Sequence, residues 1–94
     1  MWVYFIECEG GSIYTGIAKD VAERYEKHVN GKGAIYTKLN PPVRFLAAKE
    51  FQDDTEARKL EWKLKRLSRE KKMQVVEEFR KNGIRSLEGS LMKL

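Results

Sequence analysis

The sequence predicts an α+β domain in which a small three-stranded antiparallel sheet is flanked by helices, in the order β-β-α-β-α-α. Two short apolar stretches, residues 2–8 and 12–18, are separated by adjacent glycines, as in a β-hairpin. Segments that begin near Asp20 and Asp53 instead repeat apolar residues every three or four positions, which is typical of amphipathic helices. A third apolar stretch, residues 43–51, lies between these segments and supplies the remaining strand.

The length of the chain indicates a single domain. Its 94 residues, of which 41% are hydrophobic, suffice to bury one core but not to divide into two. We therefore assign residues 1–83 to one domain. Residues 84–94 carry no strong pattern and are expected to form a C-terminal tail.

The predicted hairpin carries one tyrosine in each strand. Both alternating sets of side chains in residues 2–8 are largely apolar, which indicates a central strand that is covered on each face. Tyr4 and Tyr14 share a face only if the connecting loop has an odd number of residues, because side chains alternate between faces. A three-residue loop at residues 10–12 would place them together, whereas a two-residue loop at residues 10–11 would separate them. The sequence leaves both loops open.

The first helix is expected to begin after Asp20, which forms a capping-box pattern with Glu23, and to end at Asn30. Arg24 and His28 are one turn apart, so both lie along the edge of the face that turns toward the sheet. Taken singly, the arginine could snorkel to water and the histidine could simply be packed. The predicted buried stripe comprises Val21, Tyr25, His28 and Val29.

The two later helices follow a break at Pro41 and Pro42 and the third strand. The second helix begins at residues 53–55, and its predicted core stripe comprises Ala57, Leu60, Leu64 and Leu67. Ser68 interrupts the pattern. A third helix follows over residues 72–80, with Val75, Val76 and Phe79 directed inward.

The second helix is strongly basic but has a carboxylate on its inner edge. The basic residues from 58 to 72 are Arg58, Lys59, Lys63, Lys65, Arg66, Arg69, Lys71 and Lys72. Such a run is typical of a solvated helix face or of a nucleic-acid-binding surface. Glu61, on the inner edge, requires a cation, either a basic neighbour or a metal ion. Trp62 points to another side, as a packing anchor or as a platform for a base; we favour packing.

The composition narrows the partners and the cellular setting. The net charge of +5 favours a polyanionic partner. The single cysteine, Cys8, is expected to be a small core residue, which favours a reducing, cytoplasmic setting. No apolar run approaches the ~20 residues that cross a bilayer, so we expect no membrane association.

Several short motifs occur in a specific order along the chain. They are Val3-Tyr4, then Tyr14-Thr15-Gly16, then Arg24 and His28, then residues 31–34 (Gly-Lys-Gly-Ala) and 36–38 (Tyr-Thr-Lys), and finally Glu61. Together they resemble the GIY-YIG nuclease superfamily over residues 2–67, and most closely its small stand-alone bacterial proteins and related structure-specific endonucleases. Two departures stand out: the first motif reads Trp-Val-Tyr, and Ile17 replaces a lysine that excision-repair members carry.

The resemblance implies an active site made of Tyr4, Tyr14, Arg24, His28 and Glu61. Tyr14 would activate a water molecule, although a tyrosine with a pKa near ~10 needs help from a cation or a metal-bound water. The planar guanidinium of Arg24 would bind phosphate oxygens. Glu61 would hold one divalent ion, Mg²⁺ or Mn²⁺. Tyr4 and His28 would hydrogen-bond around the water and the phosphate, with His28 as a candidate proton relay.

The function that the resemblance implies is metal-dependent hydrolysis of DNA, on branched or flapped structures and without sequence specificity, because no base-reading element is apparent. The expected nucleic-acid-binding residues are Lys32, Tyr36, Lys38, Arg58, Lys65 and Arg66. Two alternatives remain open: a nucleic-acid-binding module without useful turnover, and a protein-interaction adaptor whose charge serves solubility. Salt-sensitive DNA binding would separate the adaptor from the other two.

Overall fold

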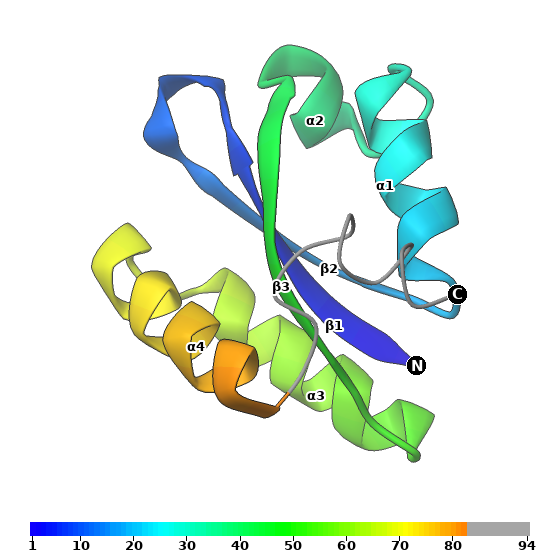
Figure 1. Cartoon of the computed structure of the whole chain (residues 1–94), viewed down its shortest axis with the longest axis vertical. Helices are drawn as coiled ribbons and strands as arrows, with labels where there is room; N and C mark the ends of the chain where they lie inside the picture. The colour runs from blue at the N-terminus through cyan, green and yellow to red at the C-terminus, as the bar shows by residue number, and fades with distance from the viewer. Residues whose placement is uncertain (83–94) are drawn as a thin grey trace.

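The structure, a computed structural model, describes residues 1–82 and has the predicted order of strands and helices (Figure 1). The elements are β1 (Trp2–Cys8), the 3-10 turn η1 (Glu9–Gly11), β2 (Ile13–Ala18), α1 (Val21–Val29), α2 (Ile35–Leu39), β3 (Pro42–Glu50), α3 (Asp54–Lys65) and α4 (Arg69–Asn82). The five-residue helix α2 lies in a connection to which the sequence had assigned no element. The expected tail at residues 84–94 lies outside the described residues.

The sheet is antiparallel with strand order β2-β1-β3, so β1 is central as predicted. Figure 1 shows α3 and α4 on one side of the sheet and α1 and α2 on the other. Odd-numbered β1 residues such as Phe5 join the core under α3 and α4, where the Phe5 ring lies 5.4 Å from that of Phe79. Even-numbered β1 residues such as Ile6 join a second core beneath α1. Each fully buried side chain of this size stabilises the fold by about 1.5–3 kcal/mol relative to exposure.

The hairpin register places both strand tyrosines on one face of the sheet. Tyr4 lies opposite Gly16 and Ile6 lies opposite Tyr14. The Cys8 N–H donates to the Ser12 carbonyl, so the loop is Glu9–Gly11, an odd-length connection. Neither predicted loop is correct: the observed loop includes residue 9, and residue 12 belongs to the return strand side of the turn.

The position of the loop follows from its two glycines. Gly10 and Gly11 have φ of +84° and +87°, a region that is costly for residues with a Cβ atom. Ser12 has extended backbone, with φ −72° and ψ 159°, and closes the turn as the partner of Cys8. The turn therefore bends at the glycine pair, with the preceding residue as its start.

Helix α1 has the predicted ends and most of the predicted buried face. The Asp20 carboxylate accepts a hydrogen bond of 3.0 Å from the Glu23 N–H, and the helix ends at Asn30. Val21 and His28 are buried, but Val29 is 55% exposed, so its assignment to the buried stripe is wrong. Val29 follows His28 by about 100° around the helix axis, which turns it away from the sheet.

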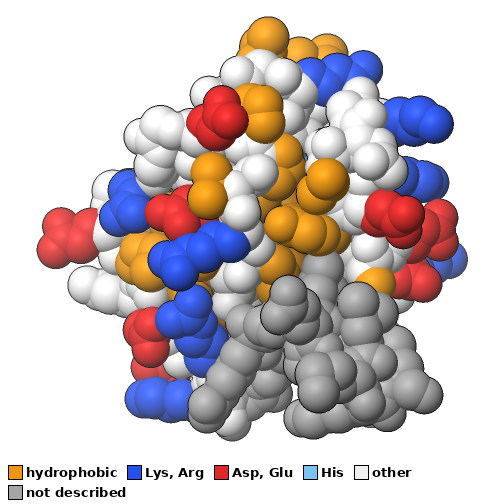
Figure 2. Space-filling view, turned by 45° about the horizontal axis from the view of Figure 1, so that its top comes forward, with side chains coloured by type: hydrophobic (Ala, Val, Ile, Leu, Met, Phe, Trp, Pro, Cys, Tyr) orange, Lys and Arg blue, Asp and Glu red, His pale blue; other side chains and the backbone are white. Residues whose placement is uncertain are grey.

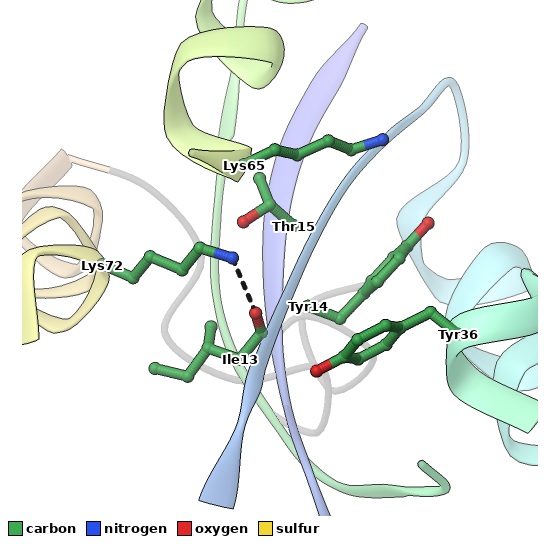
Figure 3. A pocket seen from close by; sticks show the side chains of 6 residues that line it. All are labelled: Ile13, Tyr14, Thr15, Tyr36, Lys65 and Lys72. Carbon is green, nitrogen blue, oxygen red and sulfur yellow. Dashed lines mark hydrogen bonds between the residues drawn. The ribbon is translucent and has the colours of Figure 1, made fainter. Parts of the chain in front are cut away.

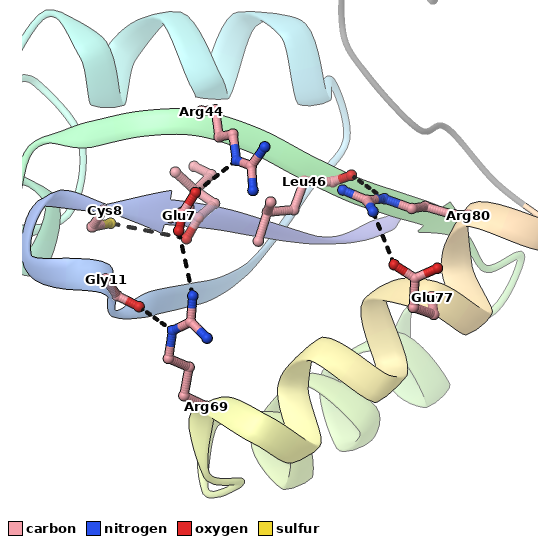
Figure 4. Close-up of polar contacts among 9 residues, drawn as sticks. Glu7, Cys8, Gly11, Arg44, Leu46, Arg69, Glu77 and Arg80 are labelled. Carbon is pink, nitrogen blue, oxygen red and sulfur yellow. Dashed lines mark hydrogen bonds and ion pairs between the residues drawn. The ribbon is translucent and has the colours of Figure 1, made fainter.

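An arginine in the first turn of α4 forms a hydrogen bond and an ion pair with the hairpin (Figure 4). Arg69 donates to the Gly11 carbonyl, and its guanidinium lies 3.4 Å from the Glu7 carboxylate. Glu7 also pairs with Arg44 of β3 at 2.6 Å. Exposed ion pairs are each worth about 1 kcal/mol or less, so this cluster orients α4 more than it stabilises the fold.

Charge and apolar side chains are mixed on the surface. Figure 2 shows basic and acidic side chains around a band of hydrophobic ones on one face of the molecule. The exposed large hydrophobic residues among residues 1–82 are Val29, Ile35, Tyr36, Leu39, Val43 and Trp62. Within this same range, no helix is both long and apolar enough to cross a membrane.

Candidate active site

Tyr4 lies at the centre of the site, in the middle of the central strand. Its side chain is 1% exposed, and its hydroxyl lies 2.8 Å from Nε2 of His28 on α1. The positive charge of Arg24, one turn before His28, acts on both the Tyr4 hydroxyl and the His28 ring. The charge of the Glu61 carboxylate also acts on Tyr4, whose pKa it raises slightly. Tyr4, Tyr14 and His28 therefore form one cluster of contacting rings, and the charges of Arg24 and Glu61 act on its buried hydroxyl group.

His28 is held by hydrogen bonds on both ring nitrogens. The Thr37 hydroxyl donates to the Ala34 carbonyl at 2.9 Å, so its oxygen can only accept from Nδ1 of His28, 2.8 Å away. The proton of a neutral His28 therefore sits on Nδ1. Nε2 is then the acceptor, and the Tyr4 hydroxyl donates to it.

The surroundings of these two residues fix their protonation. Burial, and secondly the charge of Arg24, lower the pKa of His28 to about 4, so the ring is neutral at pH 7. Burial also raises the pKa of Tyr4 well above its usual value, with a smaller contribution from Tyr14. Tyr4 therefore keeps its proton at neutral pH and is a hydrogen-bond donor.

Tyr14 lies beside this pair on the outer strand β2 and is partly exposed. Its ring meets the His28 ring edge-on at 5.1 Å and lies 6.2 Å from the Tyr4 ring. On another side it stacks against Tyr36 of α2, at 5.7 Å and an interplanar angle of 28°. Tyr36 is 40% exposed, so the Tyr14–Tyr36 pair forms the part of the site that faces solvent.

Two glycines allow the aromatic residues to approach the backbone. A Cβ atom at Gly16 would lie 2.5 Å from the Tyr4 hydroxyl oxygen and 3.0 Å from the Tyr14 ring. A Cβ atom at Gly33 would lie 2.2 Å from Nδ1 of His28. All three distances are shorter than ordinary van der Waals contact. The glycines of Tyr14-Thr15-Gly16 and of residues 31–34 therefore make room for Tyr4 and His28.

Glu61 lies on α3, on the other side of the sheet from α1, and its charge acts on the Tyr4 hydroxyl. Its side chain is 18% exposed and lies 3.4 Å from the ammonium group of Lys65, one turn later. No group of three or more His, Cys, Asp or Glu side chains with metal-site geometry occurs within residues 1–82. Both His28 nitrogens are engaged and Cys8 is buried, which leaves oxygen donors beside Glu61. A single carboxylate with hydroxyl and water oxygens fits Mg²⁺ or Mn²⁺ better than a softer ion.

The predicted nucleic-acid-binding residues occupy more than one surface. Tyr36 and Lys65 line a pocket that also includes Tyr14. Arg58 lines a different pocket on α3, together with Lys59, Trp62 and Lys63. The other members of the predicted set, Lys32, Lys38 and Arg66, are exposed.

The interpretation of Trp62 as a packing anchor is wrong. Its side chain is 57% exposed, and the Arg66 guanidinium lies 3.9 Å above its ring. Position 62 falls between Arg58 and Arg66 at four-residue spacing, which is the solvent-facing side of α3. The indole therefore forms an exposed aromatic surface flanked by cations.

The sequence missed three residues near the site. Thr37 orients His28; the Tyr-Thr-Lys motif at residues 36–38 pointed to this threonine without indicating the contact. Thr15 and Lys72 line the pocket beside Tyr14. The basic run pointed to Lys72 without indicating that this lysine is buried.

Known proteins resemble this chain in sequence and structure. Residues 1–74 match the GIY-YIG catalytic domain. UPF0213 protein SSP2268 of Staphylococcus saprophyticus is 43% identical over 77 residues, which cover 82% of this chain and 94% of that protein. UPF0213 protein SA0446 of Staphylococcus aureus strain N315 matches with the same identity and coverage.

A solved structure gives the same result. The solution NMR structure of UPF0213 protein BH0048 from Bacillus halodurans is 46% identical, covers 81% of each chain and superposes with a TM-score of 0.52. The order and spacing of the short motifs predicted this placement correctly. The chain belongs to the GIY-YIG catalytic domain family, whose nucleases generally use divalent metal ions.

Proposed function

We propose that this protein is a divalent-metal-dependent endonuclease that hydrolyses DNA phosphodiester bonds and selects its substrate by structure and not by sequence. The observation that carries this proposal is the Tyr4–His28 hydrogen bond with the Tyr14 ring 5.1 Å from His28, a cluster on which the charges of Arg24 and Glu61 act. Phosphodiester hydrolysis needs an activated water molecule, stabilisation of charge on the phosphoryl oxygens and assistance to the leaving group. The site offers Tyr14 for the water and Arg24 for the phosphoryl charge, with Glu61 to hold a metal ion.

Tyr14 is our candidate for activation of the attacking water. It is the partly exposed member of the two strand tyrosines, whereas Tyr4 is 1% exposed and keeps its proton. Tyr4 would donate a hydrogen bond and would not act as a base. The different roles proposed for Tyr14 and Tyr4 therefore follow from the difference in their solvent exposure.

Arg24 would bind the phosphate oxygens of the scissile group. Its guanidinium provides several donors in one plane, which matches two phosphate oxygens at once. Its positive charge acts on both Tyr4 and His28, which is consistent with a place near the phosphate in this proposal. The charge that develops on the phosphoryl oxygens would be stabilised by a group that is already in place.

Glu61 would hold the metal ion, with Mg²⁺ first and Mn²⁺ second among candidates. When bound, such an ion supplies Lewis-acid stabilisation of phosphate charge and a more acidic water. The Lys65 ammonium at 3.4 Å would neutralise the carboxylate when no ion is present.

His28 would position Tyr4 and would not relay protons. Both of its nitrogens have partners inside the protein, and its pKa of about 4 disfavours protonation at pH 7. This differs from the relay role that the family resemblance suggested. In this proposal the imidazole fixes the direction of the Tyr4 hydroxyl.

DNA is the proposed substrate, with branched or flapped structures preferred. The exposed cations Arg58 and Arg66 around Trp62 would contact the backbone and a neighbouring base, which suits recognition without sequence readout. Because the relatives are bacterial and Cys8 is a free thiol, we place the protein in the cytoplasm, with access to DNA. The competing proposal is a module of the same fold that binds nucleic acid without useful turnover.

An assay on branched and linear DNA, in Mg²⁺ or in EDTA, separates these proposals. The nuclease should cleave branched DNA in Mg²⁺ but not in EDTA. The Glu61→Gln variant should show no Mg²⁺-dependent cleavage. Salt-sensitive binding without metal-dependent cleavage would favour the binding module.

A further inference from the structure

A pocket of about 440 Å³ lies against the outer strand β2 and is lined by Ile13, Tyr14, Thr15, Tyr36, Lys65 and Lys72 (Figure 3). Its lining comes from both sides of the sheet. Tyr14 and Tyr36 approach from the α2 side, while Lys65 and Lys72 approach from the α3 and α4 side. The pocket therefore wraps around the free edge of the sheet, next to the tyrosine that we assign to water activation.

Lys72 is a buried cation in this pocket. It is 9% exposed, and its ammonium group donates a hydrogen bond of 2.8 Å to the Ile13 carbonyl. Burial lowers the pKa of Lys72, and the charge of Lys65 adds to this shift. An ammonium group has three donors, and a carbonyl group at 2.8 Å engages one of them. Glu61, 3.4 Å from the Lys65 ammonium group, offsets part of the repulsion between the two lysines, and an anion between Lys65 and Lys72 would offset the rest.

Thr15 provides an independent sign of a ligand. Its side chain is 1% exposed, and its hydroxyl group has no hydrogen-bond partner among the described residues. An unsatisfied buried hydroxyl costs about 1–3 kcal/mol, so such groups usually have a partner. In Figure 3 the Thr15 hydroxyl points to the side from which Lys72 reaches the strand.

The backbone of β2 also turns polar groups toward this pocket. Since the Cys8 N–H bonds to the Ser12 carbonyl, antiparallel alternation directs the N–H and C=O groups of Ile13 and Thr15 away from β1. The hydrogen bond from Lys72 to the Ile13 carbonyl agrees with this direction. The edge therefore presents backbone donors next to two cations and a hydroxyl group.

We propose that this pocket is a second phosphate site, which holds a phosphodiester group of the bound nucleic-acid strand through Lys72, Lys65 and the Thr15 hydroxyl. It is separate from the scissile phosphate, which we place at Arg24. The proposal rests on the proposed function for the identity of its substrate. By fixing a neighbouring phosphate, the site would set the position of the strand relative to Tyr14. Positioning of this kind requires no recognition of bases.

The test is the salt dependence of binding to a fluorescent DNA oligonucleotide in EDTA, with Lys72→Met, Thr15→Val and Lys71→Met. Lys71 is exposed on the same helix and provides a variant of equal charge. Lys72→Met should lower the slope of log K against log salt by about 0.7–0.9, which corresponds to one lost phosphate contact. Lys71→Met should leave the slope near that of the wild type.

Thr15→Val separates a ligand role from a structural one. The substitution removes an unsatisfied hydroxyl, so the urea midpoint should stay equal or rise, whereas DNA affinity should fall about tenfold through loss of a hydrogen bond to a charged group. If Lys72→Met fails to fold, Thr15→Val decides the matter alone. The phosphate site would be refuted if Thr15→Val bound DNA with unchanged affinity and every lysine variant that folds had the wild-type slope of log K against log salt.

Cleavage of the same oligonucleotide in Mg²⁺ distinguishes this proposal from the proposed function. If the protein cleaves DNA but Lys72→Met and Thr15→Val bind it like the wild type, the second phosphate site is overturned and the nuclease assignment stands. Their presence in a protein that cleaves nothing supports the site and overturns the nuclease assignment.

Discussion

The hydroxyl of Tyr4 donates a hydrogen bond of 2.8 Å to Nε2 of His28, and this contact fixes the orientation of both side chains. The direction of the bond follows from Thr37, whose own proton is committed to the Ala34 carbonyl. Tyr4, His28, Thr37 and Ala34 therefore form one directed series of hydrogen bonds. It runs from the central strand through α1 to the start of α2.

The first prediction concerns the pH dependence of stability, because His28 is the single histidine of the chain. Its pKa is about 4 in the folded state, against ~6.5 for an unperturbed histidine. Above pH 6.5 both states hold a neutral ring. Below it the unfolded chain binds a proton that the folded chain excludes, so stability falls by up to about 3 kcal/mol as the pH approaches 4.

Urea unfolding at pH 7 and pH 5 measures this loss. His28→Gln is the control: it is expected to be less stable at pH 7 but to lack this part of the acid dependence. Equal acid sensitivity of the two proteins would contradict a neutral, buried imidazole.

A second prediction concerns Gly33, whose missing side chain leaves space for the His28 ring. Gly33→Ala would place a Cβ atom 2.2 Å from Nδ1 of that ring. We expect a loss of about 1–3 kcal/mol from the strain, together with displaced ring resonances of Tyr4 and His28 in NMR spectra. Gly31→Ala is the matched control, because position 31 has φ +73° but no neighbour within 4 Å. That variant should also lose stability, but without displacement of the ring resonances.

A third prediction concerns Arg24 and its planar group. Arg24→Ala should reduce DNA cleavage by a factor of about 10²–10³, the usual cost of one donor to a developing oxyanion. Arg24→Lys should recover little, because an ammonium group cannot bind two phosphate oxygens in one plane. Lys27→Ala on the same helix, an exposed partner of Glu23, controls for net charge. Full activity in Arg24→Lys would show that charge alone suffices.

A fourth prediction concerns Trp62 on the exposed side of α3. Because its side chain is 57% exposed, Trp62→Ala should change the free energy of unfolding by less than about 1 kcal/mol. If a base stacks on the indole, affinity for single-stranded DNA should fall by about 1–3 kcal/mol. Fluorescence anisotropy and urea unfolding of the same variant measure both quantities. A large loss of stability with unchanged affinity would restore the packing interpretation.

Much of the fold could be predicted because its signals are local. The Asp20 cap and the apolar sets of β1 specify α1 and the central strand without reference to distant residues. The hairpin loop was misplaced because a glycine pair can occupy several positions of a turn. Val29 was misassigned because a short helix buries a narrower stripe than its apolar spacing suggests.

Candidate site residues could be proposed from the sequence where a residue type is chemically unusual for its position, as for Glu61 on a basic helix. Thr37 and Lys72 were not, since their roles depend on contacts between residues distant in sequence. Lys72 donates to Ile13, 59 positions earlier. Trp62 was misread because an aromatic residue on a helix packs in most proteins, and sequence spacing alone does not show which side of α3 faces solvent.

The central claim is that Tyr14 acts in the cleavage of DNA while Tyr4 holds the site together. Tyr14→Phe removes one hydroxyl and keeps the ring that stacks on Tyr36 at 5.7 Å. Tyr25→Phe is the matched control, because Tyr25 packs edge-on against Phe45 beneath α1. The decisive measurement is the single-turnover rate of branched-DNA cleavage in Mg²⁺ by wild type and these two variants. We predict that Tyr14→Phe loses at least about 10² in rate, as expected for loss of a general base, while it folds normally and Tyr25→Phe cleaves like wild type. Equal rates in all three proteins would contradict the account.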